Sequence, residues 1–346
     1  MLPYWFLFLI PAVGVATTRR LSSSSVGFVW LLVGGVFSLG IGLRHEVGGD
    51  WYTYLMHFNN VSSFSFIELL QRGDPGYYLT NWVVAKLGGS IYWVNLVCGA
   101  ILMSGVIAFA RRQPLPWLAL MVAVPYLIIV VAMGYTRQAV ALGFILLGLV
   151  SLSDGRVRIF VVWVLIGAAF HKSAVMILPV AGLAASQSRL TSMAWAGVAS
   201  LIGGYLFLFD SVDRLWANYI EADYQSGGGL IRVLMNAIPA GLYLVLQKHL
   251  QLNEDERRLW WWLSVLAIAC IPLVVLSSTA TDRVALYLIP LQMFVFARLP
   301  LISSDSRWST LIVLGVMAYY AAALLVWLVF AEHSYAWLPY QLVWWV

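Results

Sequence analysis

The sequence predicts an all-α polytopic transmembrane helix bundle of about 11 to 13 spans. Hydrophobic residues make up 62% of the chain, charged residues only 10%, and the mean hydropathy is +0.86, whereas a soluble domain carries about 25% charged residues. Continuous apolar runs recur along all 346 residues, while membrane β-strands would alternate apolar and polar positions. We therefore expect a single integral membrane domain over residues 1–346, with outer loops and short helices that form a cleft.

The expected spans follow the apolar runs in chain order, and most approach the roughly 17 to 25 residues that a hydrocarbon core needs. They lie near residues 2–17, 26–43, 91–110, 116–133, 137–152, 157–171, 173–187, 192–209, 230–247, 259–276, 284–298 and 309–331. No basic residue precedes the first run, so we interpret it as a span and not as a signal peptide. We expect residues 64–88 to lie on the outer surface, or to enter the membrane and return, without a full crossing.

The charges of the loops predict the orientation of the chain, because Lys and Arg favour the cytoplasmic loops of membrane proteins. With Arg19 and Arg20 inside, alternate crossings place twelve of the twenty basic residues inside and ten of the fifteen acidic residues outside. The net charge of +5 therefore reflects membrane topology and does not indicate nucleic-acid binding.

The thiol and imidazole side chains do not follow the spacing of a metal site. Cys98 and Cys270 lie within apolar runs, as buried structural thiols do, and the five histidines are scattered along the chain. We therefore expect neither a metal nor a cofactor.

Two outer loops, residues 44–90 and 210–229, are long enough to cover a site. In the first loop, Arg44 and Asp50 flank two adjacent glycines, which permit turns that other residues cannot adopt. Such a turn is able to aim both charged side chains at one point, and Tyr54 adds a hydroxyl group and a flat face suited to a sugar ring. A polar external turn without a binding role is the alternative interpretation.

Further cationic side chains stand at the outer ends of predicted spans. They are Arg137, His171, Lys172, Arg232 and Arg283. Taken alone, each is compatible with a long side chain that reaches water at the membrane boundary. Gathered on one face, they favour a cleft that binds an anion, because the planar guanidinium group suits phosphate oxygens.

Four segments resemble the EpsG-type, Wzy-like exopolysaccharide and O-antigen polymerases. Residues 44–54 resemble the opening signature of that family, with an arginine, a Val-Gly-x-Asp-aromatic stretch and a later tyrosine. The other three are Thr136-Arg137-Gln138-Ala139, Phe170-His171-Lys172-Ser173-Ala174, and Asp282-Arg283 with Tyr287. Gly49 stands where the family often has threonine, and Asp74 where glutamate is common, so the resemblance assigns no role to either residue.

The resemblance implies a multi-pass glycosyltransferase of the bacterial inner membrane with a periplasmic active site. Such enzymes move a growing glycan from undecaprenyl pyrophosphate to the non-reducing end of a new lipid-linked repeat unit. The expected partners are therefore the lipid-linked oligosaccharide donor and acceptor and the membrane lipids, and a chain-length regulator is a further candidate.

Cleavage of a sugar–pyrophosphate bond builds negative charge on the leaving group, which fixed cations stabilise. We hypothesise that Arg137, Arg232 and Arg283 hold the donor pyrophosphate, so that no metal is required. Arg44 is expected either to order the first outer loop or to bind the acceptor lipid.

A general base must also accept the proton of the acceptor hydroxyl group. His171 and Asp50 are the two candidates, with a preference for His171 because imidazole titrates near neutral pH. Tyr54 and Lys172 complete the expected substrate-binding set.

Three other functions use similar residues. A transporter of polyprenyl-linked glycans would also gather cations, but it often carries repeated halves with a site near the midplane, and this sequence has no internal repeat. An O-antigen ligase shares the donor and uses a different acceptor. A membrane O-acetyltransferase would use a histidine to activate a sugar hydroxyl group.

Overall fold

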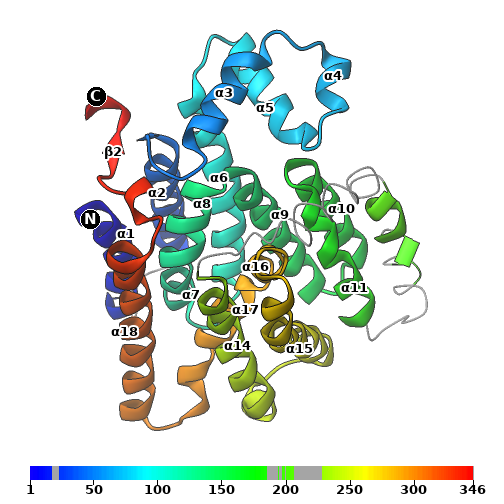
Figure 1. The fold of residues 1–346 in the computed structure, drawn as a ribbon. Helices are drawn as coiled ribbons and strands as arrows, with labels where there is room; N and C mark the ends of the chain where they lie inside the picture. Colours follow the sequence, from blue (N-terminus) through cyan, green and yellow to red (C-terminus); the bar gives the residue numbers. More distant parts are fainter. Residues whose placement is uncertain (18–22, 185–193, 195–196, 199, 206–227, 346) are drawn as a thin grey trace.

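The computed structural model is an all-α helix bundle, as predicted (Figure 1). It describes residues 1–17, 23–184, 194, 197–198, 200–205 and 228–345. Half of the predicted span 192–209 and nearly all of the predicted loop 210–229 lie outside these residues, as do Arg19 and Arg20.

Within the described residues, six helices are long and apolar enough to cross a membrane. They are α6 (Ile91–Arg111), the continuous unit of α7 (Pro116–Ala123), η2 (Val124–Val131) and α8 (Ala132–Gly134), α9 (Thr136–Ser153), α14 (Gly229–Leu246) with η6 (Gln247–His249), α15 (Glu254–Leu276), and α18 (Ser306–Phe330). Three further apolar helices join them: α1 (Leu2–Thr17), α2 (Ser23–Gly42), whose apolar part is Gly27–Gly42, and α10 (Val157–Phe170).

Two predicted spans are broken in the structure. The span expected at 284–298 begins earlier and is a pair of helices, α16 (Ser278–Leu286) and α17 (Ile289–Phe296), which continues through η7 (Leu299–Ile302) and bends by 48°. The span expected at 173–187 starts as the 3-10 helix η3 (Lys172–Ile177) and continues as α11 (Leu178–Ala184). Both breaks lie beside residues of the predicted site.

The unit 116–134 is the centre of the bundle, because its whole length is buried within the protein. A helix that is apolar on every side suits such a position. Pro125 has no N–H group to donate, and the chain widens there into the π-helical turns of η2. The indole Nε1 of Trp337, from the C-terminal segment, donates to the carbonyl of Ile129 at 2.9 Å.

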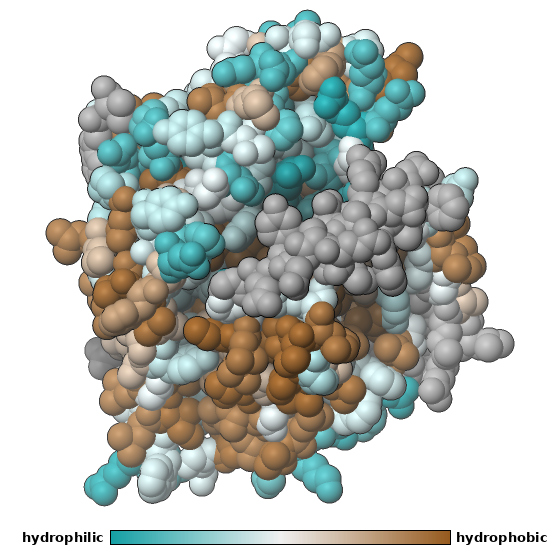
Figure 2. All heavy atoms as spheres, in the orientation of Figure 1, coloured by the Kyte–Doolittle hydropathy of each residue, from teal (hydrophilic) through white to brown (hydrophobic). Residues whose placement is uncertain are grey.

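The outer helices present apolar side chains to the surroundings. On α18, Leu311, Leu314 and Phe330 are all more than half exposed. Figure 2 shows a broad hydrophobic region over the middle and lower parts of the molecule, with hydrophilic residues gathered over the upper end. This distribution is the one expected of a protein with a lipid-facing belt and a water-facing end.

Three short helices lie together beyond the upper end of the bundle (Figure 1): α3 (Trp51–Val61), α4 (Phe66–Leu70) and α5 (Pro75–Lys86). With 12 residues, α5 is about 18 Å long, too short for a hydrocarbon core of about 30 Å. The arrangement therefore matches the expectation that residues 64–88 do not cross. Glu68 and Ser65 form a capping box that starts α4.

The C-terminal segment packs against the end of the bundle that carries α3 to α5. β2 (Gln341–Leu342) pairs antiparallel with β1 (Arg44–His45), and these are the two strands of the described chain. The segment also holds two 3-10 turns, η8 (Ser334–Ala336) and η9 (Val343–Trp345). Tyr4 donates to the carbonyl of Trp337 at 2.6 Å, so the first helix is attached to this segment as well.

Candidate active site

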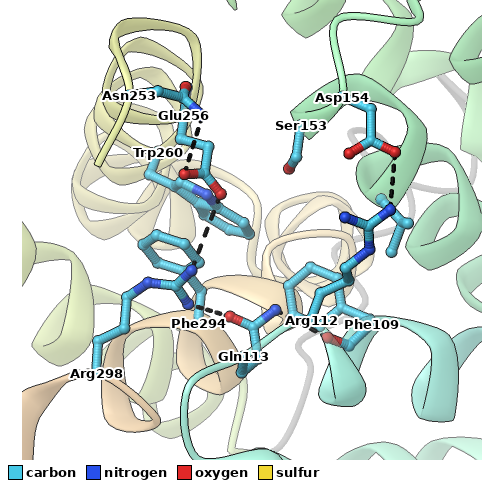
Figure 3. A pocket seen from close by; sticks show the side chains of 11 residues that line it. Phe109, Arg112, Gln113, Ser153, Asp154, Asn253, Glu256, Trp260, Phe294 and Arg298 are labelled. Carbon is cyan, nitrogen blue, oxygen red and sulfur yellow. Dashed lines mark hydrogen bonds and ion pairs between the residues drawn. The ribbon is translucent and has the colours of Figure 1, made fainter. Parts of the chain in front are cut away.

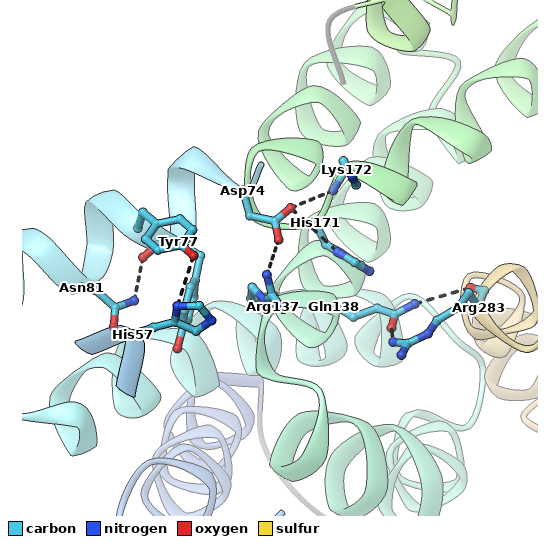
Figure 4. A network of polar contacts seen from close by, with 10 residues as sticks. His57, Asp74, Tyr77, Asn81, Arg137, Gln138, His171, Lys172 and Arg283 are labelled. Carbon is cyan, nitrogen blue, oxygen red and sulfur yellow. Dashed lines mark hydrogen bonds and ion pairs between the residues drawn. The ribbon is translucent and has the colours of Figure 1, made fainter. Parts of the chain in front are cut away.

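The predicted cationic residues come together at the end of the bundle that carries α3 to α5. Hydrogen bonds connect Asp74 to Arg137, Gln138 to Arg283, and Asp282 to Arg232. Because Arg137 and Gln138 are neighbours, as are Asp282 and Arg283, these contacts form one continuous chain across four helices. Figure 4 shows the part of this network from Asp74 to Arg283.

Asp74, a residue without an expected role, lies at the centre of the network. Its side chain is buried, and Oδ2 accepts a hydrogen bond from Arg137 Nη1 at 2.7 Å. Oδ1 accepts one from the backbone N–H of Lys172 at 3.2 Å and lies 3.9 Å from Nδ1 of His171. One carboxylate therefore contacts both Arg137, near the start of α9, and the His171–Lys172 segment that follows α10.

A glycine allows Asp74 to reach that position. Asp74 precedes Pro75 at the start of α5, and Gly76 packs against the end of α10. A Cβ atom at Gly76 would lie 3.0 Å from the carbonyl oxygen of Ala169 and from the ring of Phe170. The small residue therefore lets the start of α5, with Asp74, lie close to His171 and Lys172.

The electrostatic surroundings keep Asp74 ionised. Burial alone would raise its pKa, but the imidazole of His171, the guanidinium of Arg137 and the N–H of Lys172 bring the pKa below its usual value. Hydrogen bonds and opposite charges that favour the ionised form have this effect. Asp74 is therefore a carboxylate that accepts and does not donate.

His171 lies at a break in the helix. It ends α10 with an extended backbone (φ −152°, ψ 109°), and its N–H donates to the carbonyl of Gly167 at 2.9 Å. Its Nδ1 atom is buried without a hydrogen-bond partner, while 20% of the side chain remains exposed. The ring therefore turns Nδ1 toward Asp74 and leaves another part of its edge accessible.

Arg137 lies between two supports near the start of α9. Its guanidinium is paired with Asp74 and stands 5.8 Å from the centre of the Tyr54 ring. The side chain is 31% exposed, so it is held in place and still open to a ligand.

Arg283 and Arg232 complete the cationic group through different partners. Arg283 Nη1 donates to Gln138 Oε1 at 2.9 Å, and its guanidinium stands 5.2 Å from the centre of the Tyr135 ring. Arg232 donates to both carboxylate oxygens of Asp282, from Nε at 2.5 Å and from Nη2 at 2.9 Å. Asp282 therefore pairs with Arg232 on α14.

Asp50 faces the same group. Burial raises its pKa, while the charges of Arg283 and Arg137 lower it, and the net result is an elevated pKa. The preceding loop reaches this position through Gly48, which has a φ of +106°. A Cβ atom there would overlap the carbonyl oxygen of Met133, so only glycine permits the approach.

Arg44 and Tyr54, both expected to bind substrate, are buried, and the contacts of Arg44 fit the other expected role, to order the first outer loop. Arg44 is 0% exposed and donates to the carbonyls of Ile41 and Val47 and to the hydroxyl of Thr136, the last at 2.9 Å. Tyr54 is 2% exposed, and burial raises its pKa to about 12. Because both side chains are enclosed by protein, they support the site instead of forming its surface.

A cavity of about 160 Å³ lies elsewhere in the bundle (Figure 3). Helix α9 starts beside Arg137 and ends at Ser153, which lines this cavity, so the two sites are about 25 Å apart. Its arginines already have partners, since Arg112 pairs with Asp154 at 2.8 Å and Arg298 donates to Gln113. It is therefore distinct from the candidate active site.

Potential metal ligands are not grouped in the part of the chain that the structure describes. Among the described residues, no set of three or more His, Cys, Asp or Glu side chains is arranged to hold a metal ion. Cys98 and Cys270 are both buried as free thiols.

Comparison with known proteins gives one finding. A family model described as the EpsG family matches residues 27–342, which is nearly the whole chain. No curated protein and no solved structure gives a significant match.

Proposed function

Because the chain belongs to the EpsG family of Wzy-like polysaccharide polymerases, we propose that it joins lipid-linked oligosaccharide repeat units at the periplasmic face of a bacterial inner membrane. The donor is a growing glycan on undecaprenyl pyrophosphate, and the acceptor is the non-reducing end of a new lipid-linked unit. The outer loop 44–90 covers the reacting groups.

One observation carries this proposal. Three arginines from three different helices, Arg137, Arg232 and Arg283, meet in one polar network with Asp74 and His171. Fixed guanidinium groups in a site with little water stabilise the charge that develops on a pyrophosphate leaving group. The arrangement thus supplies the charge that the reaction needs from side chains alone.

The reaction follows from these groups. The acceptor hydroxyl oxygen bonds to the anomeric carbon of the donor, the bond to the pyrophosphate oxygen breaks, and its electron pair leaves with the lipid pyrophosphate beside the arginines. The hydroxyl proton moves to His171 or to Asp50, whose elevated pKa also suits a general base. Arg137 is exposed enough to contact phosphate oxygens while Asp74 holds it.

The orientation rests on the distribution of charge. The candidate active site lies at the end of the bundle that the loop charges assign to the outside. A site there suits a substrate whose glycan is already outside the cell membrane.

The test is an assay with purified protein in lipid nanodiscs and one defined lipid-linked repeat unit. The expected result is a ladder of lengthening products that Arg137→Ala and Arg283→Ala abolish, while Arg307→Ala, an exposed arginine at the opposite end, leaves it unchanged. Normal ladders from the two site variants would refute the assignment of the arginines. Unchanged substrate that instead moves across a vesicle membrane would identify a transporter, and transfer only to a lipid A core would identify a ligase.

A further inference from the structure

We propose that Asp74 is a positioning residue, which orients His171 as the general base and holds Arg137 beside the leaving group. This inference rests on the proposed function. It connects the two chemical tasks of the site, proton removal and stabilisation of the pyrophosphate, through one carboxylate.

Two hydrogen bonds hold the Asp74 carboxylate beside His171. Oδ1 accepts the backbone N–H of Lys172 at 3.2 Å, and Oδ2 accepts Nη1 of Arg137 at 2.7 Å. Because Lys172 directly follows His171, the bond to Lys172 sets where Oδ1 stands relative to the imidazole. Asp74 thus has little freedom to move independently of Lys172 or Arg137.

Nδ1 of His171 is available for such a contact. It is buried and has no hydrogen-bond partner, and Oδ1 of Asp74 lies 3.9 Å away. That separation exceeds hydrogen-bond range by about 0.7 Å or slightly more, and catalytic hydrogen bonds are often long without substrate and shorten in the reactive complex. When Nδ1–H donates to Asp74, Nε2 becomes the acceptor atom of the ring.

The proton then has a defined path. As the acceptor oxygen bonds to the anomeric carbon, its proton moves to Nε2 of His171, and the carbon–oxygen bond to the pyrophosphate breaks. The negative charge of Asp74 stabilises the imidazolium that forms, as the buried carboxylate does in a catalytic triad. Arg137, on the other oxygen of Asp74, stands where it contacts the departing phosphate.

The neighbouring charged and titratable groups are compatible with this role. The groups that act electrostatically with Asp74 include Arg137 from α9, His57 from α3 and Tyr287 after α16. The charges that act on the second candidate base, Asp50, are those of Arg283 and Arg137. Of the two carboxylates, Asp74 is the one with a contact to the His171 ring, at 3.9 Å.

The test compares Asp74→Asn with a matched control, Asp282→Asn. Both changes remove a carboxylate that holds a site arginine, but only Asp74 adjoins an imidazole. With both substrates saturating, Asp74→Asn should lower kcat about 100-fold or more. It should also shift the acidic limb of the pH–rate profile to lower pH, because a neutral amide no longer stabilises the protonated ring. Asp282→Asn should raise the donor KM and leave that limb in place, and Asp74→Glu should restore it in part.

A second measurement on the unmodified protein guards against a variant that fails to fold. With ¹⁵N-labelled histidine, and with His171→Gln to assign the signal among five histidines, NMR should show His171 as the Nδ1–H tautomer. An Nε2–H tautomer, or a pH–rate profile that Asp74→Asn leaves unchanged, would overturn the inference. A wild-type protein that makes no polymer would instead refute the proposed function itself.

Discussion

Gln138 and Arg283, which are 145 residues apart, hold each other by two hydrogen bonds. Arg283 Nη1 donates to Gln138 Oε1 at 2.9 Å, and Gln138 Nε2 donates to the backbone carbonyl of Arg283 at 3.4 Å. The amide therefore fixes both the side chain and the main chain of the arginine. This contact joins the start of α9 to the short helix α16, and it explains how a helix that breaks after Leu286 still presents its arginine to the site.

Gln138→Leu should weaken donor binding and leave the fold intact. A hydrogen bond to a charged group contributes about 1.5–3 kcal/mol, so the donor KM should rise about tenfold or more. Initial rates over a range of donor concentrations measure the change. Gln113→Leu is the matched control, because Gln113 accepts from Arg298 at the opposite end of the bundle. Equal effects of the two substitutions would contradict a specific role for Gln138.

The two adjacent glycines of the first outer loop should differ in their tolerance of a methyl group. Gly48→Ala should abolish polymer formation, because its φ is +106° and its new Cβ atom would overlap the Met133 carbonyl. The loop would then move away from Met133 and Gly134, and Asp50 would move with it. Gly49→Ala should retain activity, since nothing lies within 4 Å of a Cβ atom there. Polymer length on gels, at matched protein levels, measures both, and a normal ladder from Gly48→Ala would show that the approach is dispensable.

This pair of glycines also shows what the sequence alone was able to predict. Apolar runs and the loop charges predicted the helix bundle and the end at which Arg137, His171, Arg232 and Arg283 meet. The pattern and length of an apolar run are properties of neighbouring residues, so the sequence contains them. Which of two neighbouring glycines touches the bundle depends on the backbone of residues 133–134, which lies far away in the chain. No local pattern contains that information.

The same reason explains the two main differences from expectation. Arg44 was a candidate for substrate contact, but a fully buried position next to Thr136 is a tertiary property. Asp74 received no role because it stands where the family commonly has glutamate, and its partners Arg137 and Lys172 follow only 63 and 98 residues later. One signal was present in the sequence: an acidic residue in an aromatic-rich outer loop, opposite several cations, is expected to have a partner.

Arg44→Met should destabilise the protein more than it slows catalysis. It leaves the carbonyls of Ile41 and Val47 and the hydroxyl of Thr136 without their buried donor, at a cost of about 3 kcal/mol or more in the free energy of unfolding. Thr136→Val removes one of the three partners and should cost roughly 1 to 2 kcal/mol. Thermal unfolding followed by tryptophan fluorescence compares the two variants. A stable Arg44→Met protein with weaker acceptor binding would reverse this assignment.

Asp74 and Asp50 should make opposite contributions to the pH dependence of stability. The folded-state pKa of Asp74 is below its usual value, because His171, Arg137 and the Lys172 N–H outweigh burial. Its stabilising contribution is therefore present above the unfolded pKa of about 3.9 and is lost as the pH falls through the lower folded pKa. The stability advantage of the wild type over Asp74→Asn should shrink on acidification.

Burial instead raises the pKa of Asp50, in spite of Arg283 and Arg137. Ionisation then costs the folded state, so the wild type should lose stability relative to Asp50→Asn as the pH rises from about 3.9 through the higher folded pKa. Thermal midpoints of the wild type and both variants in nanodiscs, from pH 3 to pH 7, measure the two trends together. Because all three proteins share every other titrating group, differences between them cancel the general effect of acid. Trends of the same sign for both variants would contradict the opposite environments of the two carboxylates, because the partners of Asp74 favour its ionised form and burial of Asp50 favours its protonated form.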